Sequence, residues 1–250
     1  MEKDSASNSG ISSYADSANA PVAQSEASKA LEWDLSGQRF YENGVDHCAL
    51  YPQDSTGAYP TGVAWNGITG ITESPDGAEA TDLYADNIKY ATMRSAETFG
   101  GTITAYTYPD EFGICDGTAT PSDLKGVYLG QQARNAFGLA YRTQIGNDTA
   151  TSSDDGYKLH LVYGATASPS EKSFESINDS PDAIEFSWEF TTTPVACSGY
   201  KAVSTITIDS LKCDKAKLAA LEKVLFGSET TAARLPLPDE VLSILKAAAA

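Results

Sequence analysis

The sequence contains little positive charge for its size. Among its 250 residues are 17 lysines and arginines against 34 aspartates and glutamates, which leaves a formal net charge of -17. Proteins that grip duplex DNA neutralise its phosphates, spaced about 1.7 Å apart along the axis, with basic side chains. Anionic membrane surfaces attract the same basic side chains. The charge balance therefore argues against specific binding to nucleic acid and against attachment to a membrane.

Long apolar runs and a leader are also missing. No run approaches the roughly 20 apolar residues that span a bilayer. The first residues, MEKDSASNSGISS, contain no hydrophobic stretch that could act as a secretion signal. We therefore expect a protein that is made in the cytoplasm and does not enter a membrane.

Residues that commonly bind metals are few and scattered. The cysteines are Cys48, Cys115, Cys197 and Cys213, without a C-x-x-C pair, and the histidines are His47 and His160. A zinc site needs several such ligands close together. We expect four reduced, mostly buried thiols and no metal site.

Familiar catalytic motifs are absent as well. The sequence has no G-x-S-x-G, no Walker loop and no H-E-x-x-H. His47 and Cys48 are neighbours, but adjacent side chains of an extended segment point to opposite faces, so they cannot act as base and nucleophile. Glu185 and Glu189 would lie about 13 Å apart along a strand, whereas glycoside hydrolase carboxylates lie ~5–9.5 Å apart. We predict no enzyme and no cofactor. The sequence leaves open whether carboxylates on different strands lie at a catalytic distance from each other.

The sequence does contain clear alternation of apolar and polar side chains. It occurs in residues 100–108, 133–143, 157–163, 183–191 and 201–209. The clearest segment places Ile184, Phe186, Trp188 and Phe190 on one face and Glu185, Ser187, Glu189 and Thr191 on the other. A period of two with β-branched and aromatic residues predicts strands with one buried face. Spacing alone favours an ordinary solvated surface for the polar face.

Helical spacing occurs near the end of the chain. Leucines and a valine recur at this spacing over residues 218–225, before Gly227, which can end a helix. A second, shorter helix is expected from Asp239, after the proline-rich residues 236–238. The fold class is therefore mainly β, a sandwich or barrel with one flanking α-helix and a short C-terminal helix.

Composition divides the chain into three parts. Residues 1–28 hold eight serines and six alanines and few large apolar residues. Such a segment buries too little apolar surface to offset its ordering entropy, so we expect a flexible N-terminal arm. Residues 29–228 form the β domain with its flanking helix, and residues 229–250 form a C-terminal extension with the short helix.

Six blocks of the sequence carry a family resemblance: LEWDLSGQRFYENGVDHCALYP, GVAWNGITGITESPDGAEATDLYADNIKY, FGGTITAYTYPDEFGICDG, GQQARNAFGLAYRTQIGNDT, YKLHLVYGATASPSEKSFESINDSPDAIEFSWEFTTTPV and LPLPDEV. These blocks resemble the major tail proteins, or tail tube proteins, of long, flexible-tailed bacteriophages (siphophage type). They run from about Leu31 to Asp209, with LPLPDEV near the end of the chain. The resemblance implies a tail-tube-type β domain, hexameric rings that stack around a tape measure protein, and no catalytic or metal-binding residues.

The resemblance also implies partners and a location. These are further copies of the chain, the tape measure protein, the tail terminator and the baseplate or distal tail proteins, in a virion tail assembled in the host bacterial cytoplasm. Genomic DNA would pass through the lumen without specific binding, and an acidic ring would repel it. Candidate lumen-lining residues are Glu185, Ser187, Glu189, Thr191, Thr102 and Thr104. The aromatic, glycine-rich residues 51–70 are the candidate ring-stacking segment, with Tyr51, Tyr59, Trp65 and Asn66.

Two alternatives stay open. The first is a tube protein of a contractile tail or a type VI secretion machine, which fold-level physics would not separate from the siphophage type. The second is a carbohydrate-binding β-sandwich module of a phage baseplate, with Trp33, Trp65 and Trp188 as sugar-stacking platforms. Because Trp188 lies on the apolar strand face, we expect it in the core, which weakens the second alternative.

Overall fold

The computed structural model describes residues 33, 35–37, 39–77, 79–149, 156–174, 176 and 183–247. The chain divides into residues 1–35 and 36–250, and the elements below all belong to the second unit. The predicted flexible arm, residues 1–28, lies outside the described residues.

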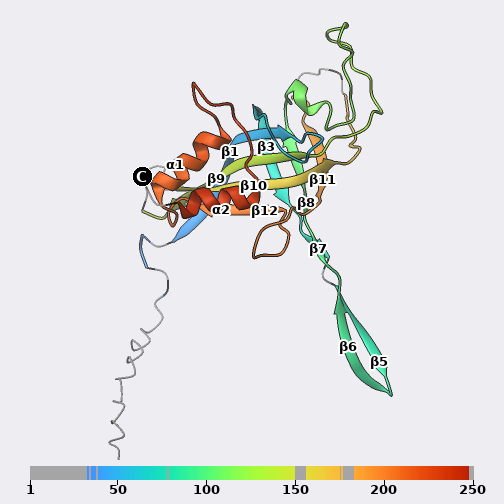
Figure 1. Ribbon diagram of the computed structural model, residues 1–250, viewed down its shortest axis with the longest axis vertical. Helices are drawn as coiled ribbons and strands as arrows, with labels where there is room; N and C mark the ends of the chain where they lie inside the picture. Colours follow the sequence, from blue (N-terminus) through green and yellow to red (C-terminus); the bar gives the residue numbers. More distant parts are fainter. Residues whose placement is uncertain are drawn as a thin grey trace, which may run out of the picture. The chain divides into compact units, whose positions relative to one another are not determined.

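A large antiparallel sheet confirms the mainly β prediction (Figure 1). Its strand order is β2-β1-β9-β10-β11-β8-β3, and β12 pairs with β10 beside β11. The strands are β1 (Phe40–Pro52), β2 (Val63–Ala64), β3 (Ile68–Glu73), β8 (Gly100–Ala105), β9 (Phe137–Asn147), β10 (Gly156–Ala167), β11 (Phe186–Thr192) and β12 (Thr205–Asp209). Each segment that was predicted from alternation overlaps one of these strands.

The sheet carries a hydrophobic core on each of its faces. Along β10, Val162 belongs to the first core, with Trp188, whereas Leu161 belongs to the second, because neighbouring side chains point to opposite faces. The sheet curls around the first core until β3 contacts β1. The Tyr141 hydroxyl on β9 donates a hydrogen bond to Glu73 at the end of β3, which helps to hold this curl.

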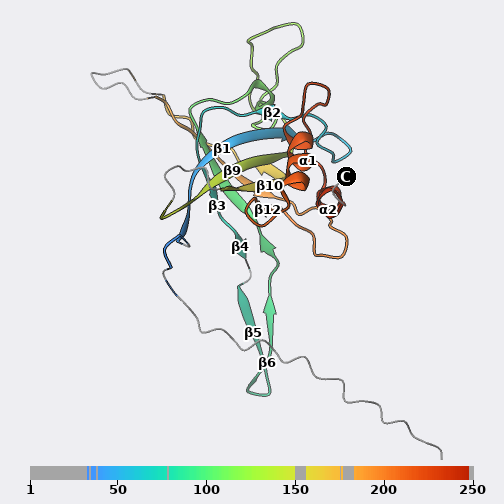
Figure 2. The ribbon, with the colours of Figure 1, turned by 90° about the vertical axis from the view of Figure 1, so that its left-hand side faces the viewer.

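Two helices cover the second core, on one side of the sheet (Figure 2). The first, α1 (Lys215–Leu225), begins at Asp214, whose carboxylate accepts hydrogen bonds from the backbone N–H groups of Ala216 at 2.9 Å and Lys217 at 3.1 Å. The second, α2 (Pro238–Lys246), has Pro238 in its first turn and buries Val241. Both helices were predicted.

The first strand, β1, was not predicted, because its backbone breaks the alternation. Gly44 and His47 have positive φ angles of 61° and 49°. The pairing of β1 with β9 shifts register on either side of Asp46. These bulges disrupt the period of two, so alternation did not indicate a strand in this segment.

A long hairpin, residues 76–98, connects β3 to β8 and was not predicted either. It comprises β4 (Asp76–Gly77), β5 (Ala80–Ala85), β6 (Ile88–Arg94) and β7 (Glu97–Thr98). β4 pairs with β7, and β5 pairs with β6. The printed pairs from Ile71–Ile103 to Leu83–Ala91 show no register shift. The hairpin therefore keeps the register of the β3–β8 pairing.

Candidate functional site

The six candidate lumen residues lie together on one exposed sheet surface, which we name the polar face. Ser187 on β11 is opposite Thr104 on β8, and Glu189 is opposite Thr102. Their neighbours in sequence, such as Trp188 and Ile103, point the other way into the first core. The polar face lies on the same side of the sheet as the helices. Leu161 and Tyr163 on β10 point toward the helices, and Thr166, which follows the bulge in β10, lies opposite Thr191 on the polar face.

Hydrogen bonds connect the polar face across three strands. The Thr69 hydroxyl on β3 donates to the Glu185 carboxylate just before β11. The Oγ1 atoms of Thr69 and Thr104 lie 2.9 Å apart. Strands β3, β8 and β11 contain no lysine or arginine. The charges that this surface presents are therefore carboxylates held among hydroxyl groups.

The long hairpin is amphipathic although neither of its faces is covered. One face, which we name the apolar face, carries Thr81, Leu83, Ala85, Ile88, Ala91 and Met93. The large members of this set are exposed, with 41% for Leu83, 64% for Ile88 and 60% for Met93. The other face carries an ion pair between Lys89 and Asp82 at 2.7 Å. A surface of this kind resembles an interface without its partner.

The predicted ring-stacking residues lie mostly inside the subunit. Tyr51, Tyr59 and Trp65 are buried, and Asn66 is exposed. The Tyr59 hydroxyl accepts a hydrogen bond from the Gly164 backbone N–H at 2.8 Å. Trp65 packs on Phe112 in the first core, with ring centroids 4.5 Å apart. Three of the four side chains therefore stabilise the single subunit, and only Asn66 has a side chain available to a neighbour.

Two of the three tryptophans that the carbohydrate-binding alternative requires are also buried. Trp65 and Trp188 are buried against each other, with ring centroids 5.7 Å apart, whereas Trp33 is 74% exposed. Sugar-stacking platforms need exposed ring faces. One of the three tryptophans meets this requirement.

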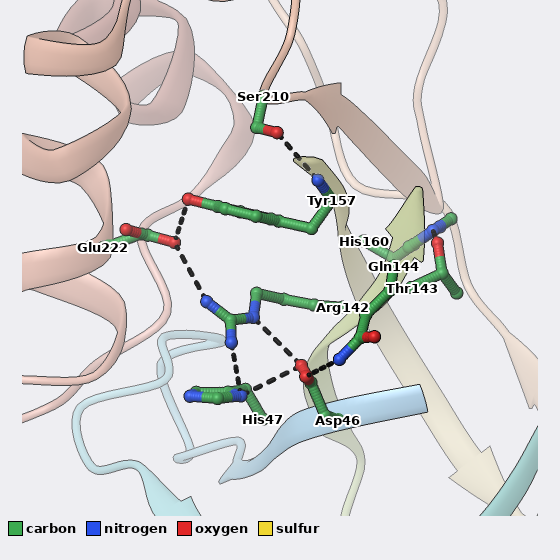
Figure 3. Close-up of polar contacts among 9 residues, drawn as sticks. All are labelled: Asp46, His47, Arg142, Thr143, Gln144, Tyr157, His160, Ser210 and Glu222. Carbon is green, nitrogen blue, oxygen red and sulfur yellow. Dashed lines mark hydrogen bonds and ion pairs between the residues drawn. The ribbon is translucent and has the colours of Figure 1, made fainter. Parts of the chain in front are cut away.

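A polar cluster around Arg142 joins β1, β9 and α1 (Figure 3). The Arg142 Nε donates to Asp46 Oδ1 at 3.0 Å, and its guanidinium lies 4.6 Å from the centre of the Tyr157 ring. The Tyr157 hydroxyl donates to Glu222 on α1 at 2.7 Å. Glu222 Oε1 also lies 3.9 Å from Arg142 Nη1. The cluster therefore ties the helix to the bulged strand.

Asp46 on β1 supplies a carboxylate to this cluster. It accepts hydrogen bonds from Gln144 Nε2 at 3.0 Å and from Arg142, and its Oδ1 lies 2.9 Å from His47 Nδ1. Partial burial raises the pKa of Asp46, but the hydrogen bonds from Gln144, Arg142 and His47 together lower it below its ordinary value. A carboxylate held in this way acts as a structural anion.

The cysteines and histidines of the described part of the chain lie in separate environments. Burial raises the pKa of the Cys48 and Cys115 thiols to about 12. His160 stacks on Tyr141 at 4.8 Å, and its Nε2 lies 3.0 Å from the Thr143 hydroxyl. Within residues 33–247 as described, no group of three or more histidine, cysteine or acidic side chains is placed to hold a metal ion. The described helices are too short and too polar to cross a membrane.

Comparisons with known proteins assign no family. No family model matches the sequence, and no curated protein matches it. A similarity search of solved structures finds the PVC sheath/tube terminator of an extracellular contractile injection system in its extended state. The two share 14% identity over 72% of this chain and 99% of that chain, with a TM-score of 0.30.

The long hairpin is a candidate functional feature that the sequence analysis missed. Its signal is the Asp86-Asn87 pair, with φ angles of 50° and 62°, between two segments of strand-forming residues. Two consecutive positive φ angles are typical of the tight turns that join antiparallel strands. This turn could have been predicted.

Proposed function

We propose that the chain is a structural subunit of a virion tail tube of the siphophage type. Copies of it would close into hexameric rings that stack around a tape measure protein and leave a conduit for genomic DNA. The resemblance of its sequence blocks to major tail proteins supports this proposal. The tail terminator and the distal tail proteins would bind the two ends of the stack.

The observation that carries the proposal is the exposed amphipathic hairpin. A two-stranded hairpin alone in water is marginally stable, and it gains stability when its apolar side packs on another surface. Leu83, Ile88 and Met93 are exposed on the apolar face of this hairpin. In an assembled tube, a neighbouring subunit would bury this apolar face and so stabilise the hairpin.

The polar face suits the inner wall of such a tube. It presents Glu185 and Glu189 and no basic side chain from β3, β8 or β11. At physiological salt, charges act over a Debye length of roughly 8 Å, so the side chains that line the inner wall determine whether the tube repels or binds DNA. Carboxylates repel the phosphates, whereas each lysine contact would add affinity and slow passage.

Deleting the hairpin tests the proposal. Residues 76–98 would be replaced by Asn-Gly, a favoured two-residue turn, so that β3 and β8 remain paired. Negative-stain electron microscopy and sedimentation would compare the variant with the full chain, alone and co-expressed with tail proteins. We expect a folded variant that forms no tubes. Tubes of normal length from this variant would contradict the proposal.

A matched control is available on the opposite face of the same hairpin. Tyr84 is 70% exposed and pairs with Lys89 on the polar side. The Tyr84→Ser variant removes a large exposed ring without touching the apolar face. We expect it to form tubes.

A further inference from the structure

Side chains, rather than backbone pairing, hold the outer edge of β3 in place. This strand pairs with β8, and no strand of the described part of the chain pairs with its other edge. Glu73, its last residue, accepts a hydrogen bond at Oε1 from the Tyr141 hydroxyl on β9. The same oxygen lies 3.4 Å from Nδ1 of His160 on β10. One carboxylate therefore joins the edge of the curled sheet to two of its central strands.

We propose that Glu73 and His160 form a pH-sensitive clasp, which holds β3 over the first core while His160 carries a proton and loosens when that proton leaves. The clasp is a property of the single subunit and does not depend on the proposed function. Its basis is the set of partners that surrounds the two nitrogens of the imidazole ring.

The partner of Nε2 determines which nitrogen holds the proton of a neutral ring. Nε2 lies 3.0 Å from the Thr143 hydroxyl oxygen, and this hydroxyl donates its proton to Glu42 Oε2 at 3.3 Å. The Thr143 oxygen is therefore an acceptor toward His160, which makes Nε2 the donor. In a neutral imidazole, the other nitrogen, Nδ1, then has no proton.

Nδ1 lies between partners on two different strands. Thr207 Oγ1 on β12 is 3.5 Å away, and Glu73 Oε1 on β3 is 3.4 Å away. An unprotonated Nδ1 accepts a hydrogen bond and repels a carboxylate, so its partner is Thr207. A protonated Nδ1 donates, and the ionised carboxylate is the stronger acceptor. Loss of the proton to solvent therefore transfers Nδ1 from β3 to β12.

The imidazole ring is held in one orientation for this exchange. It stacks on the Tyr141 ring with an interplanar angle of 3° and centroids 4.8 Å apart. The His160 side chain is 13% exposed, whereas the Glu73 side chain is 41% exposed. The ring is therefore fixed by packing, and water still reaches the carboxylate side of the clasp.

The carboxylate of the clasp remains ionised wherever histidines titrate. The hydrogen bond with His160 lowers the pKa of Glu73, and the bond from Tyr141 lowers it further, which together outweigh the effect of partial burial. Burial and the bond to Glu73 raise the pKa of Tyr141, so its hydroxyl keeps its proton. The Tyr141 bond is therefore present in both states of the clasp.

The other charges near the ring are paired with one another. Lys158, two residues earlier on the same face of β10, forms an ion pair with Glu42 on β1. It also lies opposite Asp209 on β12, which forms an ion pair with Lys212 at 3.2 Å. Aspartate, glutamate and lysine side chains ordinarily keep their charges between about pH 5 and 8, whereas histidine does not. The proton that enters or leaves the clasp in this range is therefore carried by His160.

Hydrogen exchange of the folded subunit tests the clasp. Mass spectrometry would follow the backbone amides of residues 68–73 at about pH 5.5 and about pH 8, with each rate corrected for the exchange of an unfolded peptide at the same pH. We expect the corrected protection of β3 to be about tenfold higher at the lower pH, because the charge-assisted hydrogen bond is present only there. Equal protection at the two pH values would overturn the inference.

Three substitutions assign the effect to the clasp. Glu73→Gln keeps an oxygen for the Tyr141 hydroxyl but removes the charge, and His160→Gln removes the titrating ring. Protection of β3 should be independent of pH in both variants. His47→Gln changes the other histidine of the chain, which lies beside Asp46 on β1, and should keep the tenfold difference. A Glu73→Gln variant that keeps the difference, or a His47→Gln variant that loses it, would overturn the inference.

The protonation of the ring gives a second readout, which a merely structural role of His160 would not move. Nitrogen-15 NMR of the histidine rings distinguishes a protonated nitrogen from an unprotonated one, and the His47→Gln variant identifies the signals of His160. We expect a proton on Nε2 alone at about pH 8 and protons on both nitrogens at about pH 5.5. A neutral ring with its proton on Nδ1 would overturn the inference, because Glu73 would then keep its bond without the charge.

Discussion

Glu189 on β11 lies directly opposite Thr102 on β8, and both side chains point away from the first core. This pair places a carboxylate at the centre of the polar face. The residues on either side of Glu189, Trp188 and Phe190, are buried in that core. One strand therefore carries both the interior of the subunit and the surface that we assign to the lumen.

Charge reversal on the polar face should make the tube retain DNA. In Glu189→Lys, the new ammonium groups would contact phosphates and release counterions. We expect assembled tubes of this variant to bind duplex DNA, with an affinity that falls steeply as salt rises. Fluorescence anisotropy of labelled DNA measures both effects. Glu229→Lys changes the same charge at an exposed position outside the polar face, and equal DNA binding by both variants would count against the assignment.

The buried side of the same strand should decide stability. Trp188 is fully buried, so Trp188→Ala should lower the free energy of unfolding by about 3–5 kcal/mol. Glu189→Ala, one residue away and exposed, should change it by no more than about 0.5 kcal/mol. Urea unfolding of the single subunit measures both values. Similar values for the two variants would mean that the strand faces are assigned incorrectly.

Tyr59, one of the two buried tyrosines of residues 51–70, should contribute to the stability of the fold. Tyr59→Phe removes the oxygen that accepts the Gly164 N–H, and the unpaired buried donor should cost about 1–3 kcal/mol. Thermal unfolding of the variant measures this loss. Asn66→Ala should leave the stability of the subunit unchanged because the side chain is exposed. A Tyr59→Phe variant of normal stability that cannot form tubes would support a stacking role instead.

The Arg142 cluster should make stability depend on pH. Since the pKa of Asp46 is lowered from 3.8 in the folded state, its carboxylate stabilises the fold at pH values above that number. The contribution is lost as the pH falls through the lowered value and the carboxylate takes up a proton. Asp46→Asn should therefore be less stable than the unaltered chain at neutral pH, and this difference should shrink below about pH 4. A difference that stays constant down to pH 2 would contradict this account of Asp46.

Much of the fold follows from local pattern. β11 and α1 were predicted because one periodicity runs through each without interruption, and tertiary packing agrees with it. β1 was not predicted, because positive φ angles at Gly44 and His47 and two register shifts interrupt the alternation. Bulges of this kind are stabilised by partners far away in sequence, such as Arg142.

The candidate site was predictable in part for the same reason. The register between β8 and β11 could not be read from the sequence, but alternation within each strand already grouped the polar residues. The burial of Tyr51 and Tyr59 depends on Leu225 and Gly164, whose atoms bond to their hydroxyl groups from distant parts of the chain. An aromatic, glycine-rich segment gives no local sign of such contacts, so it was interpreted as a surface.

A cryo-electron microscopy structure of the assembled protein tests the central claim most directly. The chain would be concentrated alone and also co-expressed with tail proteins, so that a nucleation requirement is met. We expect a hollow tube of stacked six-membered rings with Glu189 on the inner wall and the long hairpin against the next ring. A protein that stays monomeric under both conditions, or a tube with Glu189 on its outer surface, would contradict the account.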